Sequence, residues 1–180
     1  MTGLSDELYR RAGKARAENR PDDARRDLID AVALRRETGE ALDLAKALTG
    51  LGQIERDLHN NDAAIRNYEE AVDIYRANAD VLKLAHCIRH LGDIYRNQKR
   101  ADLAEPCYRE ALDLYRGEDK TPPLDLANAI RGFAILKHDA GETEKARTLW
   151  QEARELYAAV GIKEGVAESS RRLALLAGER

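Results

Sequence analysis

Two histidines and an aspartate near the middle of the chain are the residues best suited to chemistry. His86, His90 and Asp93 stand at helical spacing, so a helix would place all three on one face. Two imidazoles one helical turn apart can share a metal ion. However, Arg89 would oppose a cation, and three ligands on one helix leave the metal's shell incomplete. A polar binding patch is therefore our preferred interpretation, and a metal site is the alternative.

The other reactive residue types show no arrangement for catalysis. Cys87 falls in a repeated row of small residues, which favours a packed thiol, and Cys107 has no histidine at a fixed spacing that would activate it. The sequence contains no glycine-rich phosphate loop, no nucleophile elbow and no zinc-protease histidine pair. We therefore predict that the protein is not an enzyme and that it holds no cofactor and no metal.

Bulk composition restricts the classes of partner. The 180 residues carry a net charge of -3 with a pI near 5.9, so attraction to nucleic acid would need local clusters of lysine and arginine. The longest apolar runs are far shorter than the roughly 20 residues of a membrane span. The N-terminal segment is acidic and lacks the pattern of a signal peptide, and two cysteines argue against a disulfide framework. We expect a cytoplasmic protein that does not bind membranes.

An internal repeat is the strongest signal in the sequence. The segments LAKAL, LAHCI, LANAI and VAESS recur at intervals of 40, 42 and 40 residues. A second motif, YEEAVDIYR, YREALDLYR and WQEARELYA, recurs at the same intervals of 40 and 42 residues, and LIDAVALRR is a weaker earlier copy. Agreement between two independent motifs indicates copies of one structural unit. The motifs begin at Leu44, Leu84, Leu126 and Val166, and at Leu28, Tyr68, Tyr108 and Trp150.

Each period contains two stretches in which apolar residues recur at helical spacing, as Leu44, Leu48 and Leu51 do. Turn residues separate the two stretches, and Asp62 is placed to cap the second helix of its pair. No alternating pattern typical of a strand is present. The sequence predicts one domain over residues 1–180, with helix pairs at about 4–43, 44–83, 84–125 and 126–165 and a capping helix at 166–177.

The rows of small and large residues resemble the tetratricopeptide repeat family over essentially the whole chain. The period of 40 to 42 residues exceeds the usual value of about 34 and resembles the longer-helix subclass of kinesin light chain and bacterial signalling proteins. The resemblance implies an all-α fold, a right-handed α-solenoid of four helix pairs with a C-terminal capping helix. It rests on Leu48, Leu51, Gly52, Ala64, Tyr68 and Ala71, and on Ile88, Leu91, Gly92, Tyr95, Ala104, Tyr108 and Ala111.

The same resemblance implies that ligands bind in a concave groove lined by the first helix of each pair. Several candidate positions there are basic, although the protein as a whole is acidic. We therefore expect an acidic peptide segment or a terminal carboxylate as the ligand, with Arg89, Arg96 and Arg131 donating forked hydrogen bonds. The full set of candidate residues is Lys46, Thr49, Gln53, Arg56, His86, Arg89, Asp93, Arg96, Asn128, Arg131, His138 and Arg171.

A protein-interaction scaffold is thus the leading functional interpretation, and two alternatives remain open. One is a self-associating regulatory or assembly subunit, because an uncovered end or face of such an array can form a homo-oligomer. The other is a nucleic-acid-binding repeat, which the negative net charge disfavours. Tyr9 is also the only aromatic residue that we place in the groove, so bases would lack a stacking platform.

Overall fold

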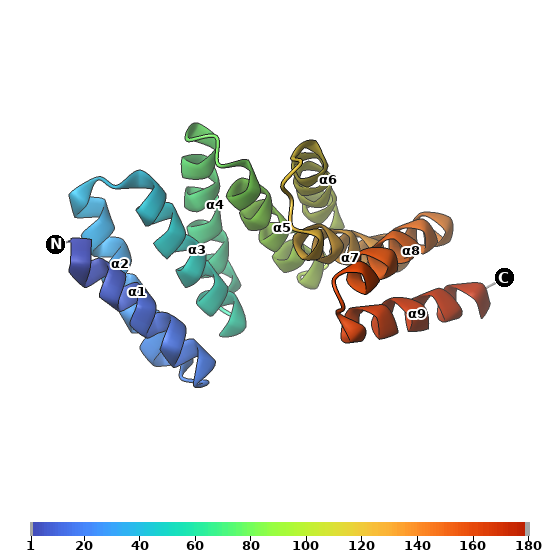
Figure 1. Ribbon diagram of the computed structural model, residues 1–180, viewed down its shortest axis with the longest axis horizontal. Helices are drawn as coiled ribbons and strands as arrows, with labels where there is room; N and C mark the ends of the chain where they lie inside the picture. The colour runs from blue at the N-terminus through green and yellow to red at the C-terminus, as the bar shows by residue number, and fades with distance from the viewer. Residues whose placement is uncertain (1, 179–180) are drawn as a thin grey trace. The chain divides into compact units, whose positions relative to one another are not determined.

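The structure is a computed structural model that describes residues 2–178, and this part of the chain is all helical. Within it, no strand accompanies the nine helices, so the predicted all-α class is confirmed (Figure 1). The helices are α1 (Thr2–Ala17), α2 (Pro21–Thr38), α3 (Ala41–Asp57), α4 (Asn61–Ala77), α5 (Val81–Asn97), α6 (Ala101–Gly117), α7 (Pro123–Asp139), α8 (Thr143–Ala159) and α9 (Lys163–Gly178).

The first helices begin earlier than the apolar pattern indicates. Residues 44, 84, 126 and 166 open the buried stripes, whereas the helices begin at residues 41, 81, 123 and 163. The opening turn of α3 explains the difference, because Ala41 and Leu42 are exposed and leave no periodic signal. Apolar spacing therefore marks the buried part of each helix rather than its start.

Backbone geometry ends the helices at very short turns. After α3, His59 adopts a left-handed φ of 63°, and the amide of Asn60 donates to the carbonyl of Glu55 at 2.8 Å. The turn after α7 repeats this arrangement, with Gly141 at φ 74° and the amide of Glu142 donating to the carbonyl of Lys137 at 2.9 Å. This is the Schellman type of helix end, in which glycine avoids the strain that other residues bear at positive φ.

The prediction that Asp62 caps α4 is wrong. Asp62 lies inside the first turn of α4, and Asn60 occupies the position before the helix without a side-chain capping bond. The side-chain amide of Asn60 instead donates to the Glu55 carboxylate at 2.8 Å. Because the turn is so short, Asn60 both follows the end of α3 and directly precedes α4. Its side chain bonds to Glu55 on α3 and therefore does not cap α4.

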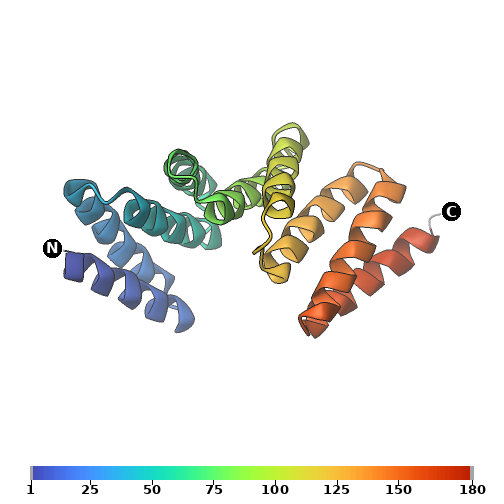
Figure 2. The ribbon, with the colours of Figure 1, turned by 45° about the horizontal axis from the view of Figure 1, so that its top comes forward.

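Two compact units divide the chain within α5, and we describe each by itself. In the first, residues 1–87, α1 packs against α2, α2 against α3 and α3 against α4. In the second, residues 88–180, α6 packs against α7, α7 against α8 and α8 against α9. Figure 2 shows the neighbouring helices α7 and α8 side by side. The single array over residues 1–180 stays a prediction.

Small residues let the helices of a pair approach closely, and large ones fill the space between them. Ala64, Ala104 and Ala146 are completely buried, as the repeat rows predict. Within each unit, an ion pair on the surface joins two consecutive second helices: Arg36 on α2 contacts Glu70 on α4 at 2.6 Å, and Arg116 on α6 contacts Glu152 on α8 at 2.8 Å. Completely buried large residues of the corresponding row are Tyr68, Tyr108 and Trp150.

Candidate interaction surface

Within each unit, the first helices of successive pairs contact each other, and we call the surface that they form there the first-helix face of that unit: α1, α3 and the start of α5 in the first unit, and the rest of α5, α7 and α9 in the second. In the first unit, Thr49 on α3 lies 3.3 Å from the Sγ of Cys87 on α5. In the second unit, Arg96 on α5 donates to the carbonyl of Gly132 on α7 at 3.4 Å. Side chains of neighbouring pairs are therefore close enough within each unit to act on one ligand.

Asp93 is the centre of a polar network on α5. Its carboxylate accepts hydrogen bonds from the Tyr108 hydroxyl at 2.7 Å and from Arg89 at 2.9 Å. Arg96 lies 3.8 Å away on the same side. Burial raises the pKa of Asp93, but the nearby His90 ring and the charge of Arg89 outweigh it and hold that pKa well below its ordinary value. Asp93 is therefore an anion that this network already neutralises.

The same contacts define the state of the His90 ring. Arg89 lies 2.8 Å from the Nε2 atom of His90, and a guanidinium can only donate, so Nε2 accepts. The hydrogen of the neutral ring is then on Nδ1, which faces Asp93 at 3.6 Å. Neither nitrogen of His90 is free for a metal, and no group of three potential metal ligands occurs among residues 2–178. The metal alternative gains no support from this geometry.

Two glycines make room for the ring of Tyr108 between α5 and α7. A Cβ at Gly132 would stand 2.6 Å from Cε1 of this ring, closer than real atoms approach. A Cβ at Gly92 would stand 3.3 Å from the ring, which is tighter than most real contacts and would require the ring to shift slightly. Burial, and the negative charge of Asp93, raise the pKa of Tyr108. The hydroxyl is therefore a permanent donor that keeps Asp93 in place.

A second polar cluster joins α7, α8 and α9. Arg131 donates two hydrogen bonds to the carboxylate of Glu168, at 2.6 and 2.9 Å. Beside this pair, the Tyr157 hydroxyl donates to Asn128 at 2.8 Å. A Cβ at Gly165 would stand 2.5 Å from the Tyr157 ring, so α8 and α9 depend on glycine at this point. Asn128, Arg131 and Glu168 are half-buried and lie on the first helices α7 and α9, whereas Tyr157 is buried beneath them on α8.

The predicted site residues are thus brought together in two groups in the second unit. Arg89, Asp93 and Arg96 form the first group, and Asn128 and Arg131 belong to the second. His138 is half-buried near the end of α7, and Arg171 is exposed on α9.

Five predicted residues lie in the first unit. Lys46 is exposed with its Nζ 4.6 Å from the centre of the Tyr9 ring, and Arg56 pairs with the neighbouring Asp57 at 2.9 Å. Thr49 donates to the carbonyl of Ala45 at 2.8 Å. Gln53 and His86 are half-buried.

Two residues that bond to the predicted site residues lie outside the predicted set: Glu168 accepts from Arg131, and Tyr108 donates to Asp93. Glu168 lies 37 residues from Arg131, and Tyr108 lies 15 residues from Asp93. A signal was available for the tyrosines, because a buried tyrosine in place of phenylalanine needs a partner for its hydroxyl. Tyr108 and Tyr157 both satisfy that expectation.

Comparisons with known proteins agree with this architecture. The family described as tetratricopeptide repeat matches residues 7–77 and 80–159. No curated protein sequence matches the chain. None of the described helices is long and apolar enough to cross a membrane.

Two solved structures share the fold at low sequence identity. BtubC (BKLC) of P. vanneervenii is 21% identical, with a TM-score of 0.80 over 88% of this chain and 65% of BtubC. Aspartyl phosphate phosphatase F of Bacillus subtilis is 13% identical, with a TM-score of 0.86 over 96% of this chain and 45% of that protein. The chain spans less than two thirds of the length of either protein.

Proposed function

This chain belongs to the tetratricopeptide repeat family, and on that premise we propose that it is a protein-interaction module that binds an acidic peptide segment on the first-helix face of its second unit. The proposed module acts by binding alone, in the cytoplasm, without catalysis of its own. The phosphatase named among the similar structures shares the fold, and we propose no phosphatase activity here, because fold alone does not transfer an activity.

An excess of arginine around Glu168 is the observation that carries the proposal. Burial raises the pKa of Glu168, but the hydrogen bonds and charge of Arg131, with the charges of Arg172 and Arg171, hold it below its ordinary value. Arg131 donates to this carboxylate directly, and Arg171 and Arg172 follow Glu168 by one helical turn on α9. This part of an acidic protein is locally positive and supports the binding of an anion.

The partial exposure of the Arg131–Glu168 ion pair supports the replacement of Glu168 by a carboxylate of a bound peptide. The side chain of Arg131 is 39% exposed and that of Glu168 is 23% exposed. A partly exposed ion pair contributes little net stability, so a carboxylate of a peptide can replace Glu168 in the fork of Arg131 at small cost. Arg89 differs, because it is buried and held by Asp93, and we assign it to positioning rather than to ligand contact.

The test measures the affinity of a fluorescent glutamate-rich peptide at low ionic strength. Glu168→Gln should strengthen binding, because it removes the internal competitor, and Arg131→Gln should weaken it, each by roughly threefold or more. Arg116→Gln is the matched control, since Arg116 is an exposed arginine paired with Glu152 on the second helices. Equal affinities for all four proteins, or weaker binding by Glu168→Gln, would refute the proposal.

A further inference from the structure

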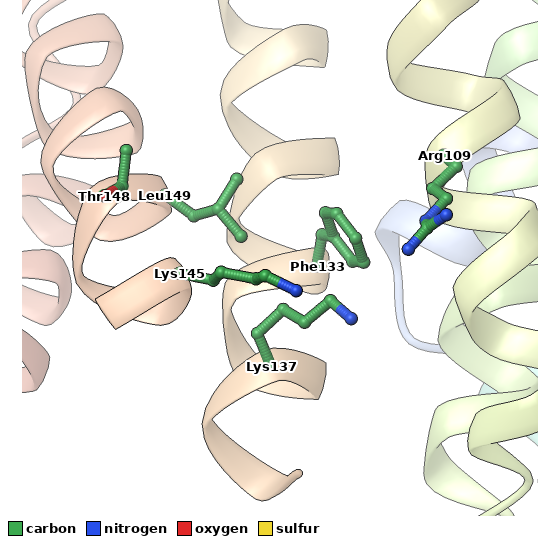
Figure 3. Close-up of a pocket in the computed structure, with 6 residues that line it drawn as sticks. All are labelled: Arg109, Phe133, Lys137, Lys145, Thr148 and Leu149. Atoms are coloured by element: carbon green, nitrogen blue, oxygen red, sulfur yellow. The ribbon is translucent and has the colours of Figure 1, made fainter. Parts of the chain in front are cut away.

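A pocket in the second unit opens between the second helices α6 and α8, with α7 as its floor. Its volume is about 330 Å³. Figure 3 shows side chains from all three helices converging on it. None of the six belongs to the candidate set on the first-helix face. The lining residues are Arg109, Phe133, Lys137, Lys145, Thr148 and Leu149.

The floor of the pocket is apolar and rigidly supported. Phe133 packs on the buried ring of Tyr108, with 6.0 Å between the ring centroids. Leu149 packs against the core cluster that contains Trp150 and Leu176. Figure 3 shows Phe133 and Leu149 pointing toward the same space. An apolar floor that already exists in the free protein can receive an apolar group without rearranging the core.

The wall is cationic and contains one buried charge. The Lys137 side chain is only 4% exposed and lies 2.8 Å from Glu105 and 2.7 Å from Glu142. Its Nζ also lies 5.1 Å from the centre of the Phe133 ring. These contacts hold Lys137 in a fixed position, so it shapes the pocket and is not available as a donor to a ligand.

The mouth carries the two charges that a ligand can reach. The side chains of Arg109 and Lys145 are 63% and 66% exposed. They contact Glu105 and Glu142, which Lys137 also contacts, so the three cations exceed the two carboxylates by one positive charge. Exposed ion pairs of this kind contribute little and rearrange readily. The mouth therefore complements negative charge on either side of an apolar group.

We propose that this pocket is a second binding site, which receives one large apolar side chain of a partner peptide with acidic residues on both sides of it. The volume lies at the lower end of the range of ligand pockets, about 300–1,000 Å³, and suits a single side chain. The apolar group lies on Phe133 and Leu149, and the flanking carboxylates contact Arg109 and Lys145. Such a site adds to the surface proposed above and is independent of it.

The test uses a fluorescent pentapeptide with one phenylalanine between two pairs of aspartates. Its binding should shift the methyl NMR signals of Leu149 and be saturable at low ionic strength. Thr148→Trp should abolish binding, because Thr148 is an exposed residue on the lining and a tryptophan there fills the pocket. Replacing phenylalanine in the peptide by alanine should also abolish binding, and lysine in place of aspartate should weaken it.

Two double variants distinguish the effect of the cations at the pocket from the effect of the protein's net charge. Arg109→Gln/Lys145→Gln should weaken binding roughly fivefold or more, whereas Lys120→Gln/Lys163→Gln, which removes two exposed cations elsewhere in the unit, should change it less than about twofold. Arg131→Gln should leave it unchanged, which distinguishes this pocket from the first-helix face. The proposal fails if the alanine peptide binds equally well, if Thr148→Trp binds normally, or if both double variants lose affinity equally.

Discussion

The hydroxyl of Tyr108 on α6 donates to the carboxylate of Asp93 on α5 at 2.7 Å, through a gap that Gly92 and Gly132 leave open. The ring that carries this hydroxyl is completely buried. Because Gly132 belongs to α7, one tyrosine links both helices of its own pair to the first helix of the next. The polar network on the first-helix face is thus fixed from the second-helix layer.

Loss of the Tyr108 hydroxyl should destabilise the fold more than loss of the Tyr157 hydroxyl. Tyr108→Phe removes a bond to a carboxylate and should lower the free energy of unfolding by about 1.5–3 kcal/mol. Tyr157→Phe removes a bond of similar length to the neutral amide of Asn128 and should cost about 0.5–1.5 kcal/mol. Urea unfolding of both variants provides the comparison. If Tyr108→Phe is no more destabilising than Tyr157→Phe, the charge of Asp93 is not important for the network.

Two glycine-to-alanine changes within helices should have opposite effects on stability, because Gly132 lies against the Tyr108 ring and Gly13 has open space beside it. Gly132→Ala would place a Cβ 2.6 Å from the Tyr108 ring, and the strain should destabilise the fold by about 1–3 kcal/mol. Gly13→Ala on α1 meets no atom within 4 Å and should stabilise it by up to about 1 kcal/mol, because alanine favours helix. Thermal unfolding of the two variants should therefore shift in opposite directions. A gain in stability for Gly132→Ala would show that the ring moves freely.

Acid should weaken the fold through Asp93. Its folded pKa lies well below the ordinary value of 3.8, because Arg89, His90 and Tyr108 outweigh the effect of burial. A carboxyl with a depressed pKa stabilises the folded state above its unfolded pKa, and this contribution disappears as the pH falls through the folded pKa. Wild type should therefore be more stable than Asp93→Asn near neutral pH, and the difference should shrink below about pH 4. Urea unfolding at a series of pH values measures it, and a constant difference contradicts the prediction.

Local patterns predicted the helix pairs and the buried rows, because burial repeats with the helical period. Tyr68, Tyr108 and Trp150 could be assigned to one buried row from their spacing, and all three are completely buried. The ion pair of Arg89 with Asp93 was also within reach, since the two residues are one helical turn apart.

Contacts between pairs could not be predicted in the same way. The bond between Arg131 and Glu168 depends on how α9 stacks on α7, which a repeat interval does not define to within the length of one side chain. For the same reason the sequence indicated a basic surface but not that Arg89 is buried and already neutralised. Asp62 was misassigned because the turn before it is too short to give a capping residue to each helix.

Each unit contains a buried ionic contact at the same repeat position, and the signs of the charges are reversed between the two units. In the first unit, Glu55 on α3 accepts from Arg25 on α2 at 2.8 Å and from Asn60 in the following turn at 2.8 Å. In the second unit, Lys137 on α7 donates to Glu105 on α6 and to Glu142 in the following turn. Glu55 and Lys137 occupy the same repeat position and are both buried, so either sign of charge is accommodated when its neighbours are opposite or neutral.

Exchange of the charges in the second unit tests this equivalence. Lys137→Glu alone places a third carboxylate beside Glu105 and Glu142, and it should lower the free energy of unfolding by about 3 kcal/mol. Adding Glu105→Arg and Glu142→Asn reproduces the residues around Glu55, and the triple variant should recover to within about 1 kcal/mol of wild type. Glu105→Arg alone is the control, because it opposes Lys137 and should also destabilise. Urea unfolding of the three variants decides the matter: if the triple variant is no more stable than Lys137→Glu, the contact depends on its surroundings in each unit rather than on complementary charge at a shared repeat position.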